Sequence, residues 1–359
     1  MKESQFVQKV KKYLNLVVSQ SGADLHLSAG NYPAIRIDSK LKQMREEEMI
    51  AQSDMEVLAQ ELLNKERFEK LQADRQIDFS LDMGNDIRFR VNIFYQKGML
   101  SFCARLIPNK IKTLKELGLP EDIYEFADCH QGLFLVVGPN GHGKTTTIAS
   151  LIDYINQRKE KHIVTIEDPV EYIFKSQQSL VEQREVYEDA VDFPTALKAS
   201  FREDVDVVFV GEMRDLETIS TAITAAETGH LIFGTLHTND AIQTIDRIID
   251  VFPAHQQNQI RYQLSSVLVG VVSQRLLPKI GGGRVPAIEI MKCNNAIENL
   301  IRQSQTHQIG VVMETSLDDG MISINRSLAN LVSEGVVSLE DAEGFATDKN
   351  SFKMLLESV

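Results

Sequence analysis

The sequence predicts an α/β protein of two domains, the second built around a parallel sheet. Three observations support this prediction. The chain has 359 residues, more than one hydrophobic core normally serves. Near residue 130 the pattern changes to continuous apolar strands that alternate with helical segments, as in parallel sheets covered by helices. A glycine-rich segment follows the first of these strands and leads into a helix.

The first hundred or so residues have the pattern of a smaller α+β domain. An amphipathic helix opens the chain, a strand is expected at 36–41, and a charged helix is expected near 53–73. Two segments that follow, QIDFSLDM and DIRFRVNIFYQ, read as antiparallel strands because apolar and polar residues alternate in the second. We place this domain at residues 1–106.

Residues 107–122 contain two prolines and are predicted to be a linker. The second domain then occupies residues 123–359. We expect its first part to alternate strands and helices in this order: LFLVV, TTTIASLIDYINQRK, HIVTI, a long helical and loop stretch, DVVFVG, ETISTAITAAETG and LIFGTL. The tail after about residue 292 is predicted to be mainly helical.

The composition excludes several classes of protein. No uncharged apolar stretch approaches the ~18–20 residues needed to span a bilayer. The three cysteines, Cys103, Cys129 and Cys293, are too far apart for a CxxC pair, which argues against a disulfide framework or a cysteine zinc site. The formal net charge of −13 weighs against a protein that wraps duplex DNA, so no nucleic-acid partner is expected.

The strongest motif is GPNGHGKTTT, residues 138–147, which satisfies the P-loop pattern G-x-x-x-x-G-K-[ST]. Backbone amides of such a loop bind phosphates, Lys144 would reach the β- and γ-phosphates, and the Thr145 hydroxyl would bind Mg²⁺. ATP and Mg²⁺ are therefore the expected ligands. The predicted nucleotide-binding residues are Gly138, Pro139, Asn140, Gly141, His142, Gly143, Lys144, Thr145 and Thr146.

Polar residues end three further predicted strands. Glu167 follows HIVTI, Glu212 follows DVVFVG and His237 follows LIFGTL. In open parallel sheets, ligands bind beyond the carboxyl ends of the strands, so we expect these three side chains to meet Lys144 and Thr145 at one edge. This convergence predicts a catalytic site rather than nucleotide binding alone.

ATP hydrolysis requires a group that orients water and groups that stabilise charge around the γ-phosphate. Glu212 and Glu167 are the candidate water-positioning carboxylates, and Glu212 is preferred. A P-loop protein usually has a metal-binding Asp where this chain has Gly211 followed by Glu212, so contact of Glu212 with the metal is expected to be indirect. His237 is predicted to sense the γ-phosphate by a hydrogen bond.

Two histidines flank the strand LIFGTL, His230 before it and His237 after it. A strand rises ~3.3 Å per residue with side chains on alternate faces, so the two would point to opposite faces roughly 20 Å apart. They cannot bind one metal ion. The role of His230 is less defined by its position.

Three arginines of the first domain are a further feature. Arg88 and Arg90 share one strand face, and Arg105 lies on the next strand, MLSFCARLI. Such arginines often serve solubility only. The alternative is an arginine finger, in which cationic groups of a separate domain move onto the γ-phosphate of a bound nucleotide.

Together these segments resemble the PilT-like retraction ATPases of bacterial type IV pili, in the secretion ATPase superfamily. The resemblance is carried by VTIEDPVEY, REDVDVVFVGEMRD, AAETGHLIFGTLHTNDA and SQRLLPKIGGGRVPA, and by ADLHLSAGNYPAIRIDSKL and RFRVNIFYQ near the N-terminus. It therefore covers nearly the whole chain.

The resemblance implies a PAS-like N-terminal domain and a RecA-like P-loop ATPase domain, assembled as a homo-hexamer. It implies functional roles for Glu167, Glu212, His230 and His237, and it matches the three arginines to the family's N-domain arginines. The ring would hydrolyse ATP to power pilus retraction and twitching motility. It would act on a platform protein at the cytoplasmic face of the inner membrane at the pilus base, with a second retraction ATPase as a further possible partner.

Two departures from the family pattern stand out. The signature AIRNLIRE is AIENLIRQ here, with Glu298 and Gln303 substituted, which affects retraction rather than ATP chemistry. The P-loop has Asn140 and His142 where GPTGSGKST is commoner, at positions where backbone amides bind, so we expect function to be kept.

The alternatives are an accessory retraction paralogue, an extension or type II secretion ATPase, a nucleic-acid translocase, and a non-hydrolysing adaptor. Extension and secretion relatives typically carry a four-cysteine zinc insertion, which three scattered cysteines cannot build.

Overall fold

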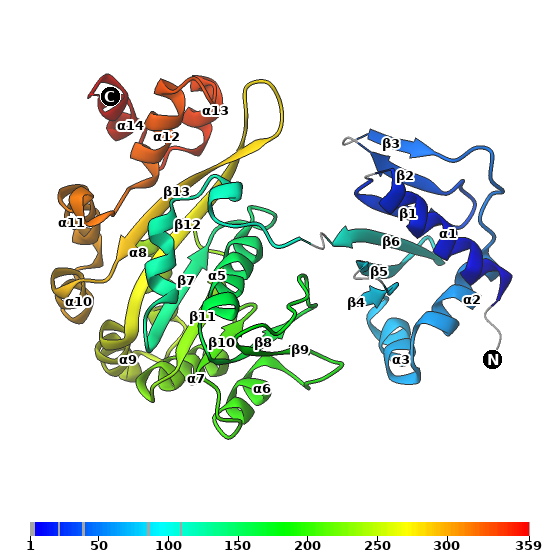
Figure 1. Cartoon of the computed structure of the whole chain (residues 1–359), viewed down its shortest axis with the longest axis horizontal. Coiled ribbons are helices and arrows are strands. Elements are labelled where there is room, and N and C mark those ends of the chain that lie inside the picture. The colour runs from blue at the N-terminus through cyan, green and yellow to red at the C-terminus, as the bar shows by residue number, and fades with distance from the viewer. Residues whose placement is uncertain (1–3, 21, 38–39, 85–86, 108–109, 359) are drawn as a thin grey trace. The chain divides into compact units, whose positions relative to one another are not determined.

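The computed structural model describes residues 4–20, 22–37, 40–84, 87–107 and 110–358. It divides into two compact units. The first contains residues 1–110 together with Asp168–Ile173, and the second contains Ile111–Glu167 and Phe174–Val359. Each is an α/β structure with its own sheet and core (Figure 1).

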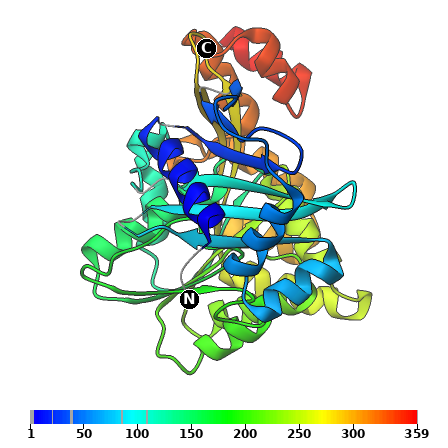
Figure 2. The ribbon, with the colours of Figure 1, turned by 90° about the vertical axis from the view of Figure 1, so that its right-hand side faces the viewer.

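The first unit is built on a six-stranded antiparallel sheet in the order β3-β2-β1-β6-β5-β4. Its elements are α1 (Gln5–Ser19), β1 (Asp24–Ser28), β2 (Ala34–Ile37), β3 (Lys40–Gln43), α2 (Gln52–Leu62), α3 (Lys65–Asp74), β4 (Gln76–Asp82), β5 (Arg88–Gln96) and β6 (Met99–Ile107). Figure 2 shows α1 lying across the strands. The alternation in β5 buries Phe89, Val91 and Ile93 in the core beneath α1 and α2, which confirms the predicted half-buried strand.

Two predictions for this unit were wrong in detail. The single strand expected at 36–41 is instead two paired strands, β2 and β3, with residues 38–39 outside the described residues. The single helix expected near 53–73 is two helices, because α2 ends at Leu62 and Asn64 caps α3 by accepting from the Arg67 amide at 2.8 Å. Strand β1 was not predicted.

The second unit has a seven-stranded sheet in the order β13-β12-β7-β11-β10-β8-β9. Its strands are β7 (Gly132–Val137), β8 (His162–Glu167), β9 (Leu180–Glu185), β10 (Val207–Val210), β11 (Leu231–Leu236), β12 (Leu268–Pro278) and β13 (Arg284–Lys292). All neighbours are parallel except β12 and β13, which form an antiparallel hairpin. The predicted α/β fold with a parallel sheet is confirmed, and the structure adds one antiparallel hairpin at the edge of that sheet.

Helices cover both faces of this sheet. Its helices are α4 (Tyr124–Ala127), α5 (Lys144–Arg158), α6 (Phe193–Ser200), α7 (Leu216–Glu227), α8 (Ala241–Asp250), α9 (Ala254–Val267), α10 (Asn295–Arg302), α11 (Ile309–Thr315), α12 (Ile324–Ser333), α13 (Leu339–Phe345) and α14 (Lys349–Ser358). Leu133, Leu135 and Val137 of β7 share a core with α7, α8 and α9. The alternate residue Phe134 stacks on Phe126 of α4, with ring centroids 4.4 Å apart.

Short 3-10 turns complete the second unit: η1 (Lys115–Leu117), η2 (Glu121–Ile123), η3 (Thr306–Gln308) and η4 (Leu317–Asp319). The stretch predicted as a linker, 107–122, includes η1 and the start of η2, and Leu114 and Leu119 within it are buried. The tail after residue 292 is mainly helical, as predicted. Helices α12, α13 and α14 pack on the end of the β12–β13 hairpin that is nearer its turn. This end of the unit is opposite α6 and α9 (Figures 1 and 2). No helix in the described part of the chain is both long and apolar enough to cross a membrane.

Candidate functional site

The site is built at the carboxyl edge of four adjacent parallel strands. Strands β7, β11, β10 and β8 are neighbours in the sheet, so the residues that follow them lie along one edge. The P-loop follows β7, His237 follows β11, Glu212 lies two residues after β10, and Glu167 ends β8. The order of strands therefore places His237 between the P-loop on one side and Glu212 on the other.

The P-loop bends through glycines in a left-handed conformation. Gly138, Gly141 and Gly143 have φ angles of 144°, 76° and 87°. A Cβ atom at Gly138 would lie 2.4 Å from the carbonyl oxygen of Gln274, so this position requires glycine for space as well as for φ. Gly143 immediately precedes α5, whose first amides have no carbonyl partner within the helix and form an anion-binding end.

Lys144 is buried at the start of α5, with 8% of its surface exposed. Its Nζ donates to the carbonyl oxygens of Gly138 at 2.8 Å and Pro139 at 3.1 Å, both within the P-loop. It also lies 3.3 Å from Nδ1 of His237. The ammonium group is thus held at the mouth of the loop, where it can exchange carbonyl oxygens for phosphate oxygens.

His237 connects the lysine to a carboxylate. Its Nδ1 accepts from Lys144, so its Nε2 carries the proton and donates to Oε1 of Glu212 at 2.8 Å. Burial, with Lys144 and Arg214 nearby, lowers the pKa of His237 below its ordinary value, although Glu212 acts in the opposite sense. At neutral pH the imidazole is uncharged, and its contact with Glu212 is a hydrogen bond rather than an ion pair.

The two candidate carboxylates have different surroundings. The side chain of Glu212 is 19% exposed and contacts His237 and Arg214. Glu167 is 3% exposed, and its Oε1 accepts from Oγ1 of Thr165 at 2.7 Å and Nε2 of Gln183 at 3.4 Å. Glu212 is therefore linked to the P-loop lysine through His237. The preference for Glu212 as the water-positioning carboxylate stays a prediction.

The residues at the edge suit the binding of ATP with its Mg²⁺. The loop amides, the end of α5 and Lys144 supply positive potential for phosphates, and Thr145 adds a half-buried hydroxyl in the first turn of α5. The described residues include no cluster of three or more His, Cys, Asp or Glu side chains able to hold a metal by themselves.

His230 does not join this group. It precedes β11 and so lies at the amino end of that strand, the opposite edge of the sheet. Its Nδ1 is 3.0 Å from the carbonyl oxygen of Ala225, and its ring is 5.6 Å from that of Phe201. The role that the family resemblance implies for His230 stays a prediction.

The three predicted arginines lie on one face of the first unit's sheet. Arg90 and Arg105 are register partners on β5 and β6, and Arg88 lies two residues from Arg90 on the same strand. Nε of Arg105 donates to Oδ1 of Asp24 at 2.8 Å, and Nη1 of Arg90 donates to Oε1 of Glu171 at 3.3 Å. Arg90 and Arg105 thus pair with carboxylates of their own unit in the single chain.

Sequence reasoning missed the residues that β12 brings to the site. Oγ1 of Thr147 donates to Oε1 of the buried Gln274 at 2.8 Å, which joins α5 to β12. Nη2 of the buried Arg275 donates to the carbonyl oxygen of Asn239 at 2.7 Å, just beyond His237. The segment SQRLLP carried the family resemblance, but no local pattern indicated that it is the strand beside the P-loop.

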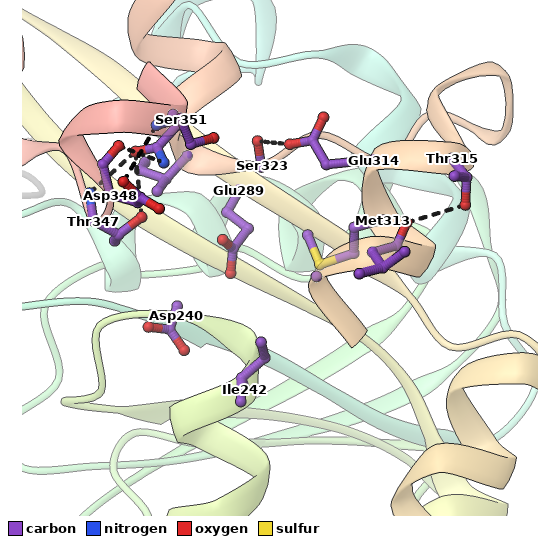
Figure 3. A pocket seen from close by; sticks show the side chains of 14 residues that line it. Asp240, Ile242, Glu289, Met313, Glu314, Thr315, Ser323, Thr347, Asp348 and Ser351 are labelled. Atoms are coloured by element: carbon purple, nitrogen blue, oxygen red, sulfur yellow. Dashed lines mark hydrogen bonds between the residues drawn. The ribbon is translucent and has the colours of Figure 1, made fainter. Parts of the chain in front are cut away.

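A cavity of about 440 Å³ lies next to the segment that follows His237. Figure 3 shows Glu289 of β13 pointing toward Asp240 and Ile242. Glu289 is 7% exposed and accepts backbone hydrogen bonds from Ala241, at 2.8 Å, and from Ile324, the first residues of α8 and α12. Burial raises the pKa of Glu289 to about 7, because the helix amides do not fully replace water around its charge.

Glu289→Gln is expected to gain stability relative to the native chain as pH rises. Between the unfolded pKa of 4.5 and the folded pKa of about 7, Glu289 binds more protons in the folded state than in the unfolded state. Its contribution to stability is therefore fully present below pH 4.5 and is lost as the pH rises through 7. The difference in unfolding free energy between variant and native chain should shift by roughly 2–3 kcal/mol in the variant's favour from pH 5 to pH 8. Urea unfolding at both pH values measures this shift. Glu334→Gln, at an exposed residue, is the control, and its unfolding free energy relative to the native chain should not change with pH. The prediction is contradicted if the difference for Glu289→Gln does not change with pH either.

A mostly parallel sheet with a P-loop after one strand, β7, and an acidic residue after another, β10, two places along the sheet, defines a P-loop ATPase. The type II/IV secretion system protein family model matches residues 1–282, and the chain belongs to this family.

Within this family, the chain is similar to individual ATPases of type IV pili. The chain is 43% identical over 343 residues to the type IV pilus retraction ATPase PilT of Pseudomonas aeruginosa, which covers 96% of this chain and 99% of the relative. It is 34% identical over 348 residues to the type IV pilus ATPase PilU of the same organism, covering 97% and 91%. The crystal structure of the pilus retraction motor PilT with bound ADP superimposes with a TM-score of 0.89 at 46% identity, covering 96% of this chain and 99% of that one. The predicted resemblance to PilT-like ATPases is confirmed.

Proposed function

We propose that this chain hydrolyses Mg-ATP as a hexameric motor that powers type IV pilus retraction and twitching motility. The observation that carries this proposal is the chain of contacts from Lys144 through His237 to Glu212. It joins the group that binds the γ-phosphate to the carboxylate that would orient the attacking water. Similarity to PilT over nearly the full length supports the pilus system as the site of action.

In this mechanism the phosphates of ATP displace the P-loop carbonyl oxygens from Lys144. The Thr145 hydroxyl would bind Mg²⁺, which would supply charge neutralisation for the phosphates. Glu212 accepts a hydrogen bond from the attacking water and orients it in line with the leaving oxygen. His237 donates to the γ-phosphate or to Glu212, so loss of the γ-phosphate changes its partner.

The arginines of the first unit belong to the proposal as an intersubunit element. Arg90 and Arg105 would leave their own carboxylates and, together with Arg88, approach nucleotide bound to the second unit of a neighbouring subunit. Closure and release at successive interfaces would move a platform protein at the cytoplasmic face of the inner membrane. A second retraction ATPase would be a further partner.

The substituted family signature lies on α10. Glu298 and Arg302 form an ion pair at 3.4 Å, and Nε2 of Gln303 donates to Oδ1 of Asn299 at 3.3 Å. Ile297 and Ile301 are buried, so the helix keeps its apolar side. Both substituted side chains thus make contacts within their own helix, and we propose that the segment still serves retraction.

The test combines enzymology with complementation. We expect the purified chain to release phosphate from Mg-ATP as a hexamer, and to restore twitching to a bacterium that lacks its own PilT-like ATPase. A variant with Arg88→Ala, Arg90→Ala and Arg105→Ala is expected to remain hexameric but to lose most turnover.

Three outcomes would contradict parts of the proposal. A hexamer that binds ATP without turnover would indicate an adaptor. Turnover without restored twitching would indicate a motor of another secretion machine. Unchanged turnover in the triple-arginine variant would contradict the intersubunit role of the arginines and leave the rest of the proposal standing.

A further inference from the structure

His142 makes a contact that the P-loop motif does not require. The backbone amide of Leu276 donates to Nδ1 of His142 at 2.8 Å. Strand β12 pairs with β7 only as far as Ser273, whose register partner is Val137. Beyond that pair β12 lies beside the P-loop, and the imidazole nitrogen supplies the acceptor that a strand carbonyl would otherwise supply.

A second side chain attaches the same part of the loop to the same hairpin. Nη1 of Arg284, the first residue of β13, donates to the carbonyl oxygen of Gly141 at 3.3 Å. The ring of His142 also approaches that of Phe345 on α13, with centroids 6.3 Å apart. Adjacent loop residues are thus fixed to the β12–β13 hairpin, one through its own side chain and one through its carbonyl.

We propose that His142 is a positioning residue for the nucleotide: its neutral imidazole ties the P-loop to β12 and so keeps the loop amides directed at the phosphates. Glycine in the left-handed region at Gly141 and Gly143 leaves the loop many conformations when it is not tied. Fixing it before the nucleotide arrives lowers the ordering cost of binding. The inference rests on the proposed function only in requiring that this loop binds nucleotide phosphates.

The tie depends on the protonation state of the imidazole. Only the neutral ring accepts at Nδ1, because a protonated ring would direct an N–H at the N–H of Leu276. The charged groups that act on the ring are Arg275 on β12, Lys144 on α5 and Arg284 on β13, and together with burial they lower the pKa of His142. The link is therefore intact at neutral pH and breaks on acidification below the ordinary histidine range.

The experiment compares the affinity of the full-length chain for Mg-ADP in the native form, in His142→Asn and in His142→Ala, at pH 8 and at falling pH down to the lowest pH at which each chain stays folded. Asparagine places an amide oxygen near the position of Nδ1 and does not titrate, so it is the conservative variant. His255→Asn, at an exposed histidine on α9, is the matched control. Melting without nucleotide checks that each variant is folded, and KM and kcat for ATP are measured beside the affinity.

At pH 8 we expect His142→Ala to bind Mg-ADP about three- to tenfold more weakly, the effect of one lost hydrogen bond, and His142→Asn to restore most of the affinity. KM for ATP should rise by more than kcat falls. As the pH falls, the native chain should lose affinity relative to His142→Asn. The ratio of the two affinities is the quantity compared, because the titration of the nucleotide phosphates cancels in it.

Equal affinities of the native chain and His142→Ala at pH 8 would overturn the proposal while leaving the ATPase function intact. The proposal is also overturned if the ratio of the Mg-ADP affinities of the native chain and His142→Asn does not change with pH. If the native chain does not bind Mg-ADP at all, both the inference and the proposed function fail.

Discussion

Replacing Glu212 with glutamine is expected to lower kcat for ATP hydrolysis by about 10²–10⁴-fold while ATP still binds. Glutamine keeps an oxygen that accepts from Nε2 of His237, so the link to Lys144 survives. What it loses is the negative charge that, in the proposed mechanism, orients and polarises the attacking water. Phosphate release at saturating Mg-ATP, with nucleotide affinity measured separately, gives the two quantities.

Two further variants make this result specific. Glu227→Gln, on the exposed side of α7, should leave turnover unchanged. Glu167→Gln should lower kcat less than Glu212→Gln, because Glu212 contacts His237, whereas Glu167 accepts from Thr165 and Gln183. A normal rate for Glu212→Gln together with an inactive Glu167→Gln would transfer the water-orienting role to Glu167.

Lys144→Met is expected to abolish hydrolysis to below ~1% of the native rate and to weaken ATP binding about 10- to 100-fold. Methionine has a stem of similar length, so the buried space at the start of α5 stays filled and the loss is that of the ammonium group. In the proposed mechanism this group binds the β- and γ-phosphates, where charge develops in the transition state. Titration with a fluorescent ATP analogue and phosphate release measure the two effects.

The same variant removes the donor to Nδ1 of His237, so the contacts of Glu212 change as well. Lys198→Ala is the control, because Lys198 is an exposed lysine of the same unit that pairs with Glu217 outside the site. Hydrolysis by Lys144→Met at a rate near that of the control would show that the P-loop does not act on the γ-phosphate. The assignment of the whole edge as the active site would then be wrong.

Much of the fold followed from patterns short enough to lie within one element. The continuous apolar runs of β7, β8, β10 and β11 predicted strands buried on both faces, and each is a strand of the second sheet. Ile148, Leu151, Ile152 and Ile155 recur at helical spacing along α5 and are buried. These predictions succeeded because a local period determines which face an element buries.

Other elements gave no such local signal. Strand β9 is an edge strand with the charged sequence LVEQRE, so its apolar pattern is weak. Strand β12 follows α9 with no glycine or proline between them, so its start is not marked in the sequence. In both cases pairing with a partner strand, rather than the residues alone, determines the structure.

By itself, the sequence determined the P-loop, the acidic and histidine residues after the apolar strands, and the family to which the chain belongs. These depend on residues adjacent along the chain or on the general rule that parallel strands share a carboxyl edge. The tertiary structure decided which of those residues touch: His237 between Lys144 and Glu212, with His230 at the other edge. It also decided that the amide of Leu276 binds His142, 134 positions earlier, because the sheet order places β12 beside β7, a pairing that no local pattern encodes.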